Sequence, residues 1–320
     1  MTIMTYSAAA KAALAEEMRR DPYVWAVGED LGRGGVFGQY AGLVEEFGPD
    51  RISDAPISEA AIMGACVGAA MTGTRPVVEM RFSDFALCAV DELVNQAAKA
   101  RFMFGGQSKV PLVVREPIGM WRSSAAQHSQ SLESWYAHIP GLVVVCPSTP
   151  ADNKALLKAA IRCDDPVVYM EHKNLWPMEG EVPDGEILLP FGKARQVQQG
   201  GDITMVSWSA QVHVCAEAAK SLAAEGIGVD LWDLRTLWPW DREAILTSAA
   251  KTGRAVIVHE AVQVGGFGAE IAATIAEHTG ARVSRLGAPR APIGYAPPVE
   301  NAVRVTASQI VAHARTALNG

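Results

Sequence analysis

The feature that most constrains the fold is a regular alternation between short valine-rich runs and alanine-rich helical segments. In the first half, apolar runs that predict strands lie at 23–27, 76–80, 110–115, 142–146 and 166–171. Patterns that predict helices lie between them, at 5–20, 58–72, 84–104 and 149–162. Nearly continuous apolar strands joined by helices are typical of parallel sheets covered on both faces. The pattern therefore predicts a doubly wound α/β fold with right-handed connections.

The alternation lapses between 173 and 199, where proline, glycine and acidic residues gather, and then resumes. The second half predicts strands at 203–207, 229–233, 255–259 and 282–286, and helices at 211–224, 242–251, 269–278 and 308–318. A chain of 320 residues is longer than one hydrophobic core usually supports. We therefore predict two α/β domains, at 1–185 and 186–320.

Composition and charge exclude several classes of protein. With 49% hydrophobic and 20% charged residues the chain is globular, and a net charge of −7 without a basic run argues against nucleic acid or an anionic membrane as partner. The uncharged segment 60–74 is shorter than the roughly 20 residues that span a bilayer. The first ten residues lack a signal-peptide pattern. We expect a cytoplasmic protein.

Cysteine and histidine usage gives no sign of a disulfide framework or a metal centre. The five cysteines are odd in number, widely spaced and without a CxxC pair: Cys66, Cys88, Cys146, Cys163 and Cys215. We expect buried free thiols, as in a reducing compartment. The histidines show no HExxH spacing, which argues against a histidine-ligated metal.

Two residues stand out by type and place. Glu59 follows Ser58 at the start of a helix whose next 15 residues carry no charge. Either Ser58 caps this helix and Glu59 complements its dipole, or Glu59 is a carboxylate that shares a proton with a ligand. His128 follows the strand at 110–115 and its loop, a position where open α/β sheets bind ligands, so it is a candidate for proton transfer.

Two other enzyme classes have weaker motifs. Ser129 beside His128 lacks the GxSxG context of a serine hydrolase. The run Gly265–Gly268 precedes a helix and either cradles a phosphate, as in an NAD oxidoreductase, or forms a tight strand-to-helix turn. Its spacing differs from that of a dinucleotide-binding fingerprint, which favours the turn.

Taken together, a set of segments spread over almost the whole chain resembles one family. They are Glu29–Asp30, 34–37, 42–43, 47–48, 54–59, 73–79, 82–85, 128–131, 138–142, 147–150, 164–167, 233–236 and 265–270. These segments are similar to the beta subunits of thiamine-diphosphate-dependent 2-oxo acid dehydrogenases, a group that includes the acetoin dehydrogenases.

The resemblance implies a transketolase-like pyrimidine-binding domain followed by a transketolase C-terminal-like domain. In such enzymes the glutamate matched by Glu59 hydrogen-bonds a ring nitrogen of the cofactor's aminopyrimidine. Phe85 matches the aromatic residue that stacks on this ring, with Phe82 and Ile57 as further cofactor contacts. His128 matches the histidine that assists intermediates and acyl transfer to lipoyl. The implied activity is cleavage of a 2-oxo acid or acetoin, with the acyl group passed to lipoyl.

The resemblance also implies ions and partners. A potassium ion is expected on mostly backbone oxygens of Leu112, Ala160, Ile161, Cys163 and Asp165. The GDG motif that binds Mg²⁺ and the cofactor's diphosphate is absent from this chain and belongs to an alpha subunit in this family. The expected assembly is an α2β2 heterotetramer that meets a lipoyl-bearing acyltransferase core.

Three residues depart from the family pattern. Trp121 lies where many relatives have a run of glycines, Arg290 where they have aspartate, and Arg81 where they have a neutral residue, so Arg81 could read an acidic group or pair with Asp84. These departures keep an alternative open, in which the chain is a non-catalytic binding or scaffold subunit.

Overall fold

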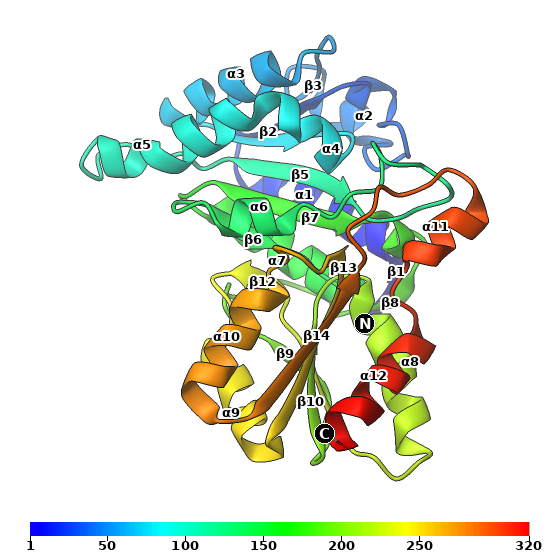
Figure 1. Cartoon of the computed structure of the whole chain (residues 1–320). Helices are drawn as coiled ribbons and strands as arrows, with labels where there is room; N and C mark the ends of the chain where they lie inside the picture. The colour runs from blue at the N-terminus through cyan, green and yellow to red at the C-terminus, as the bar shows by residue number, and fades with distance from the viewer. Residues whose placement is uncertain (320) are drawn as a thin grey trace. The chain divides into compact units, whose positions relative to one another are not determined.

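The computed structural model describes residues 1–319, which form two compact units (Figure 1). Unit 1 contains residues 1–118 and 135–191, and unit 2 contains residues 119–134 and 192–320. No helix among the described residues is long and apolar enough to cross a membrane. The segment 119–134, which carries His128, thus groups with the C-terminal half of the chain.

The sheet of unit 1 is parallel. Its strands are β2 (Val24–Gly28), β3 (Ile52–Asp54), β4 (Arg75–Glu79), β5 (Val113–Ile118), β6 (Val143–Val145) and β7 (Val167–His172), in the spatial order β6-β7-β5-β4-β2-β3. The strands predicted from valine-rich runs are confirmed to within a few residues. Strand β3 is not predicted by the sequence pattern, because three residues are too short a run to show one.

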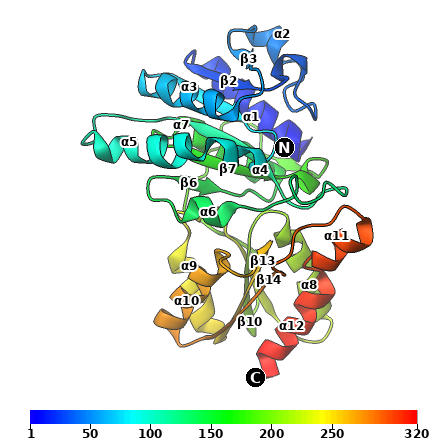
Figure 2. The same cartoon turned by 45° about the horizontal axis from the view of Figure 1, so that its top comes forward.

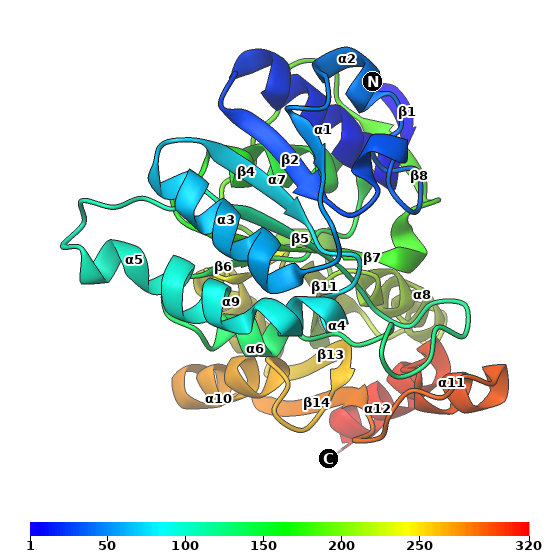
Figure 3. The same cartoon turned by 90° about the horizontal axis from the view of Figure 1, so that it is seen from above.

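Helices cover both faces of this sheet (Figure 3). On one face, α1 (Tyr6–Arg20) packs against α7 (Pro150–Arg162), and their alanines and leucines form the core together with the sheet. The side chain of Thr5 caps α1 and that of Thr149 caps α7, each by accepting a backbone N–H three residues later. The other face carries α3 (Glu59–Met71). The doubly wound prediction is therefore confirmed for unit 1.

The single helix predicted at 84–104 is wrong in detail. The chain forms α4 (Ser83–Ala86), a 3₁₀ turn (η2, Leu87–Ala89), a π-helical segment (η3, Glu92–Ala97) and α5 (Ala98–Met103). Alanine-rich periodicity predicts a helical backbone, but it does not distinguish the 3₁₀, α and π hydrogen-bonding patterns, in which the bonded residues are three, four and five positions apart. Short elements that were not predicted are η1 (Leu31–Arg33), α2 (Leu43–Phe47), α6 (Glu133–Ala137), η4 (Lys173–Leu175) and an antiparallel pair of β1 (Thr2–Thr5) with β8 (Glu179–Val182).

Unit 2 is a second doubly wound sheet. Its strands are β9 (Arg195–Gln198), β10 (Ile203–Ser207), β11 (Val229–Asp233), β13 (Arg254–Val262) and β14 (Arg282–Ala288), in the order β14-β13-β10-β11-β9. All pairs are parallel except β11 with β9, which is antiparallel. The strand β9 lies in the segment predicted to lack regular structure. The chain also forms a short strand, β12 (Thr236–Trp238).

The helices of unit 2 also form two layers (Figure 2). Helices α8 (Gln211–Ala223) and α12 (Ala307–Asn319) pack on one face, while α9 (Arg242–Thr252) and α10 (Gly268–Thr279) pack on the other. A short helix, α11 (Pro297–Val303), follows β14. The core is formed by β10, β11 and β13 against α8 and α12.

The cysteine prediction is confirmed for bonding and wrong for one side chain. All five cysteines are free, and Cys66, Cys146 and Cys215 are buried. Cys163 is half-buried and Cys88 is exposed. Cys88 lies in the 3₁₀ turn η2, whose helical phase the sequence pattern did not predict.

Candidate active site

Three neighbouring strands of unit 1 end at one edge of the sheet, and the candidate residues follow directly. Strand β2 leads into Glu29 and Asp30, β4 leads into Arg81 and Phe82, and β3 leads through a short loop to Glu59. Since β3, β2 and β4 are adjacent and parallel, their carboxyl ends meet at the same edge, where ligands bind in open α/β sheets. The topology thus brings these side chains together from three separate parts of the sequence.

An acidic cluster with one arginine forms at this edge. The Nε atom of Arg81 lies 3.0 Å from Oε2 of Glu29, and its Nη2 pairs with Asp30. Burial raises the pKa of Glu29, Arg81 opposes this, and the negative charge of Glu59 raises it further. Glu29 and Glu59 therefore share an electrostatic environment. Of the two alternatives predicted for Arg81, an acidic group or Asp84, the structure shows pairs with the acidic side chains of Glu29 and Asp30.

Glu59 is the first residue of α3 and is half-buried. Ser58 occupies the N-cap position but its side chain makes no capping hydrogen bond, so the capping interpretation is not supported. The face of α3 that continues from this end is exposed and made of small residues: Ala61, Gly64, Ala65 and Gly68. Ile57, in the loop before the helix, is 77% exposed. Glu59 therefore lies at the end of an exposed helix face whose small side chains allow a ligand or another chain to approach the backbone closely.

Aromatic side chains gather next to Phe82. The ring centroids of Phe82 and Phe85 are 5.4 Å apart at an interplanar angle of 89°, and those of Phe37 and Phe82 are 6.0 Å apart. Trp176 packs on Phe37 at 4.8 Å, and Nζ of Lys173 lies 4.7 Å from the centroid of the Phe82 ring. The structure thus brings together the predicted pair Phe82 and Phe85. Phe37, Lys173 and Trp176 were not predicted as neighbours of Phe82, because no local pattern links them to it in the sequence.

A buried ionic network supports this edge of the sheet. Arg115 on β5 donates from Nε to Oε2 of Glu171 at 2.8 Å and from Nη1 to the Tyr40 hydroxyl at 2.8 Å. Tyr40 in turn donates to Oε2 of Glu79, the last residue of β4, at 2.7 Å. All four side chains are almost completely buried. The network fastens the glycine-rich segment before Tyr40 to three strands.

His128 belongs to unit 2, in the loop between β5 and α6, and is half-buried. The glycine run at 265–268 connects β13 to α10, as the tight-turn interpretation predicts. A Cβ atom on Gly266 or Gly268 would lie 2.6 Å or 2.8 Å from the ring of His259. These glycines are therefore needed to admit this ring, whose pKa burial lowers to about 4.

Four of the carbonyl oxygens expected to bind potassium, those of Leu112, Ala160, Ile161 and Cys163, already accept hydrogen bonds. Arg75 donates from Nη1 to Ile161 O at 3.1 Å and to Cys163 O at 2.9 Å. Leu112 O accepts from a backbone N–H at 2.8 Å, and Ala160 O accepts from the N–H of Cys163 at 3.1 Å. A carbonyl oxygen has a second lone pair, so coordination of a cation is compatible with these bonds. The Arg75 guanidinium supplies positive charge at the same place.

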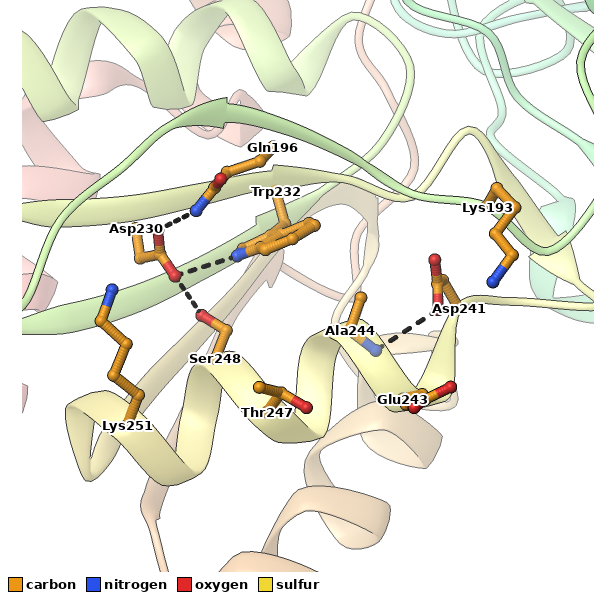
Figure 4. A pocket seen from close by; sticks show the side chains of 10 residues that line it. All are labelled: Lys193, Gln196, Asp230, Trp232, Asp241, Glu243, Ala244, Thr247, Ser248 and Lys251. Carbon is orange, nitrogen blue, oxygen red and sulfur yellow. Dashed lines mark hydrogen bonds between the residues drawn. The ribbon is translucent and has the colours of Figure 1, made fainter.

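No group of three or more His, Cys, Asp or Glu side chains within residues 1–319 could hold a metal ion. A separate cleft of about 380 Å³ lies in unit 2 beside β9, β11 and α9 (Figure 4). Burial would raise the pKa of Asp230 in this cleft, but hydrogen bonds from Ser248, Trp232, Gln196 and the Gly200 N–H outweigh burial and lower it. This carboxylate is satisfied by the protein itself, and none of the predicted site residues lines the cleft.

Comparison with known proteins assigns both halves of the chain. Residues 3–178 match the family described as transketolase, pyrimidine binding domain, and residues 192–310 match transketolase, C-terminal domain. A solved structure named as a split gene transketolase, in an inactive β4 tetramer, aligns with a TM-score of 0.83 over 99% of this chain and 98% of that chain. At 24% identity this likeness shows the fold.

Several curated proteins are similar over nearly the full length. The chain is 44% identical to the 2-oxoisovalerate dehydrogenase subunit beta of Bacillus subtilis, covering 98% of both chains. It is 43% identical to the acetoin:2,6-dichlorophenolindophenol oxidoreductase subunit beta of Cupriavidus necator, covering 96% of this chain and 95% of the relative. It is 41% identical to the mitochondrial pyruvate dehydrogenase E1 component subunit beta of Dictyostelium discoideum, covering 96% and 89%. The chain therefore belongs to the family of beta subunits of thiamine-diphosphate-dependent 2-oxo acid and acetoin dehydrogenases.

Proposed function

We propose that this chain is the beta subunit of a dehydrogenase that cleaves a 2-oxo acid or acetoin and passes the acyl group to lipoyl. The observation that carries the proposal is the convergence of Glu29, Glu59, Arg81 and Phe82 at the carboxyl ends of β2, β3 and β4. Full-length similarity to subunits of such enzymes supports it. The proposed domains are 1–185 and 186–320, and the family matches at 3–178 and 192–310 support this division.

Glu59, Phe82, Phe85 and Ile57 are the proposed cofactor residues. When bound, thiamine diphosphate supplies a carbon nucleophile that also accepts the electrons released by C–C cleavage. The carboxyl group of Glu59 would form a hydrogen bond with a ring nitrogen of the aminopyrimidine and share a proton with it. Burial raises the pKa of the nearby Glu29 and the charge of Glu59 raises it further, so the two carboxyl groups share one electrostatic environment at this edge. Phe82 and Phe85 would give the ring an apolar surface on which to stack.

His128 is the second proposed catalytic residue. An imidazole ionises near neutral pH, so it can donate a proton to an acyl-bearing intermediate or accept one from a dihydrolipoyl thiol. His128 follows β5 in the sequence, and Glu59 follows β3. Its proposed role is acyl transfer to lipoyl.

The proposed partner is an alpha subunit that carries the GDG motif and holds Mg²⁺ and the diphosphate, in an α2β2 heterotetramer. The exposed small-residue face of α3 supports a protein partner, because small side chains allow another backbone to approach closely. A lipoyl-bearing acyltransferase core is the proposed acceptor. A cytoplasmic location remains a proposal, supported by five cysteines that are all free.

The experiment that tests the proposal is turnover by a complex reconstituted with the alpha subunit, comparing wild type with Glu59→Gln. We expect the variant to assemble but to lose cofactor-dependent turnover by at least about 100-fold, as removal of a general acid–base group does. Glu45→Gln is the matched control, since Glu45 is an exposed glutamate of α2. Normal turnover by the Glu59 variant would refute its role.

The same reconstitution tests the alternative of a non-catalytic scaffold subunit. The three relatives described above are all named as dehydrogenase or oxidoreductase subunits, so this alternative has no support among them. An assembled wild-type complex that binds no thiamine diphosphate would favour the scaffold. Turnover of one member of a panel of pyruvate, branched-chain 2-oxo acids and acetoin would exclude it and identify the substrate.

A further inference from the structure

The segment that carries His128, residues 119–134 and here called the His128 loop, comprises the loop before α6 and the first two residues of α6, and its backbone is strained. Three non-glycine residues adopt positive φ within four positions: Arg122 at 46°, Ser123 at 58° and Ala125 at 61°. Such values are uncommon for residues with a Cβ atom and persist only where surrounding contacts hold them. The loop's conformation therefore requires anchors.

Two carboxylates of unit 2 accept backbone N–H groups of this loop. Oε1 of Glu260, on β13, accepts from the Met120 N–H at 2.7 Å. Oε2 of Glu300, on α11, accepts from the Ser123 N–H at 2.6 Å. Hydrogen bonds to ionised groups are short and about twice as strong as neutral ones. One of the two anchors thus acts directly on a residue with positive φ.

The Glu300 carboxylate is itself fixed in place. It is 4% exposed, and its second oxygen, Oε1, accepts from the Arg304 guanidinium one helical turn further along the chain. With one oxygen on Arg304 and the other on the loop, the carboxylate has little freedom to rotate. Glu300 therefore fixes the loop backbone at Ser123 relative to α11.

The other end of the loop is anchored separately. The indole Nε1 of Trp208 donates to Oε1 of Glu133 at 2.9 Å, and the Phe267 N–H donates to Oγ of Ser134 at 2.9 Å. Trp208 is buried and stacks on His259 at 5.2 Å and 17°. Both ends of the His128 loop are thus attached to unit 2, and His128 lies between the two sets of anchors.

We propose that Glu260 and Glu300 are positioning residues that hold the strained His128 loop in the conformation that acyl transfer to lipoyl requires. This inference rests on the proposed function for the role of His128. Neither carboxylate needs to touch substrate: each acts by accepting a backbone N–H. Loss of either anchor would let the positive-φ segment relax and displace His128.

The test uses the reconstituted complex with Glu260→Gln and Glu300→Gln, which keep the side-chain shape but replace each charge-assisted hydrogen bond to the loop with a weaker neutral one. Glu277→Gln is the matched control, an exposed glutamate on α10 of the same unit. Two rates are measured on each sample: reduction of an artificial dye without lipoyl, and acyl transfer to a purified lipoyl domain. We expect the ratio of transfer to dye reduction to fall about tenfold, because hydrogen bonds to charged groups contribute enough free energy for such a change.

Trypsin gives a second readout, independent of activity. The bond after Arg122 is a cleavage site in an exposed position, and its next residue is Ser123, whose N–H binds Glu300. Cleavage after Arg122 should accelerate in both variants and not in Glu277→Gln. An unchanged transfer-to-dye ratio with unchanged cleavage would overturn the proposal. An equal fall of both rates would also overturn it, because that indicates general damage to the complex.

Failure of the proposed function would look different. A wild-type complex that turns over no substrate of the panel would refute the proposed function. In that case the trypsin rates still decide whether the two carboxylates hold the loop.

Discussion

The hydroxyl of Tyr40 donates to Oε2 of Glu79 at 2.7 Å, linking the glycine-rich segment of unit 1 to the end of β4. The same hydroxyl accepts from Nη1 of Arg115, whose other nitrogens bind Glu171. Glu79 thus lies in a buried network of one full positive charge and two carboxyl groups. This imbalance has consequences for the pH dependence of stability.

We predict that the contribution of Glu79 to the free energy of unfolding falls as the pH rises from about 4.5 to about 7. Burial raises the pKa of Glu79 from 4.5 to about 7, although Arg115 opposes the shift. The folded state therefore binds a proton that the unfolded state has released, and this contribution to stability is lost as pH rises through the folded pKa. Urea unfolding at pH 4.5 to 8 should give a steeper loss of unfolding free energy for wild type than for Glu79→Gln. Parallel curves would contradict this.

Phe85→Ala should weaken cofactor binding. An aromatic pair contributes about 0.5–1.5 kcal/mol beyond area burial, so the Kd of the reconstituted complex for thiamine diphosphate should rise about two- to tenfold. Tyr23→Ala serves as control, because Tyr23 is 62% exposed and follows α1. Isothermal titration of both variants measures the difference. An unchanged Kd for Phe85→Ala would remove Phe85 from the cofactor site.

His128→Ala should slow acyl transfer to lipoyl more than it slows dye reduction. General acid–base groups contribute about 10²- to 10⁴-fold, so the transfer rate should fall by at least about two decades. The control is His138→Ala, since His138 is exposed and follows α6. Single-turnover acylation of a purified lipoyl domain measures the rate. Transfer at the wild-type rate would exclude His128 from this step.

Potassium should raise the melting temperature of the complex relative to sodium at equal ionic strength if the carbonyls of Leu112, Ala160, Ile161, Cys163 and Asp165 bind it. Ligands that bind only the folded state stabilise it by mass action. Arg75→Met should enhance the potassium effect, because it frees the carbonyls of Ile161 and Cys163 from a competing cation. Equal melting temperatures in both salts, for both proteins, would show that no potassium ion binds here.

The amino-acid pattern predicted most of the regular elements correctly. Strands β10 and β11 were predicted residue for residue, at 203–207 and 229–233. Buried parallel strands and their covering helices show in sequence because each must be apolar along a run or a face of its own. The helix at 84–104 was predicted less well, because its 3₁₀ and π segments depend on packing rather than on periodicity.

The candidate site was only partly visible in the sequence. Glu59, Phe82, Phe85 and His128 were singled out by local motifs and by resemblance, and their roles stay predictions. Glu29, Phe37 and Trp176 were missed, although Glu29 follows β2 directly and position after a strand was a usable signal. Phe37 and Trp176 gave no local signal, because their contact joins segments that are distant in sequence.

By itself, then, the sequence determined two doubly wound α/β halves and the family, since hydrophobic periodicity and short motifs are local properties. Only the tertiary structure decided that Arg81 pairs with Glu29 and Asp30, and that the His128 loop is anchored by Glu260 and Glu300. These relations depend on strand order and on loop backbone conformation. Neither is encoded in the spacing of residues: the Arg81 pairs arise when β2 and β4 align their carboxyl ends at one edge, and the loop anchors arise when β13 and α11 pack beside residues 120–123.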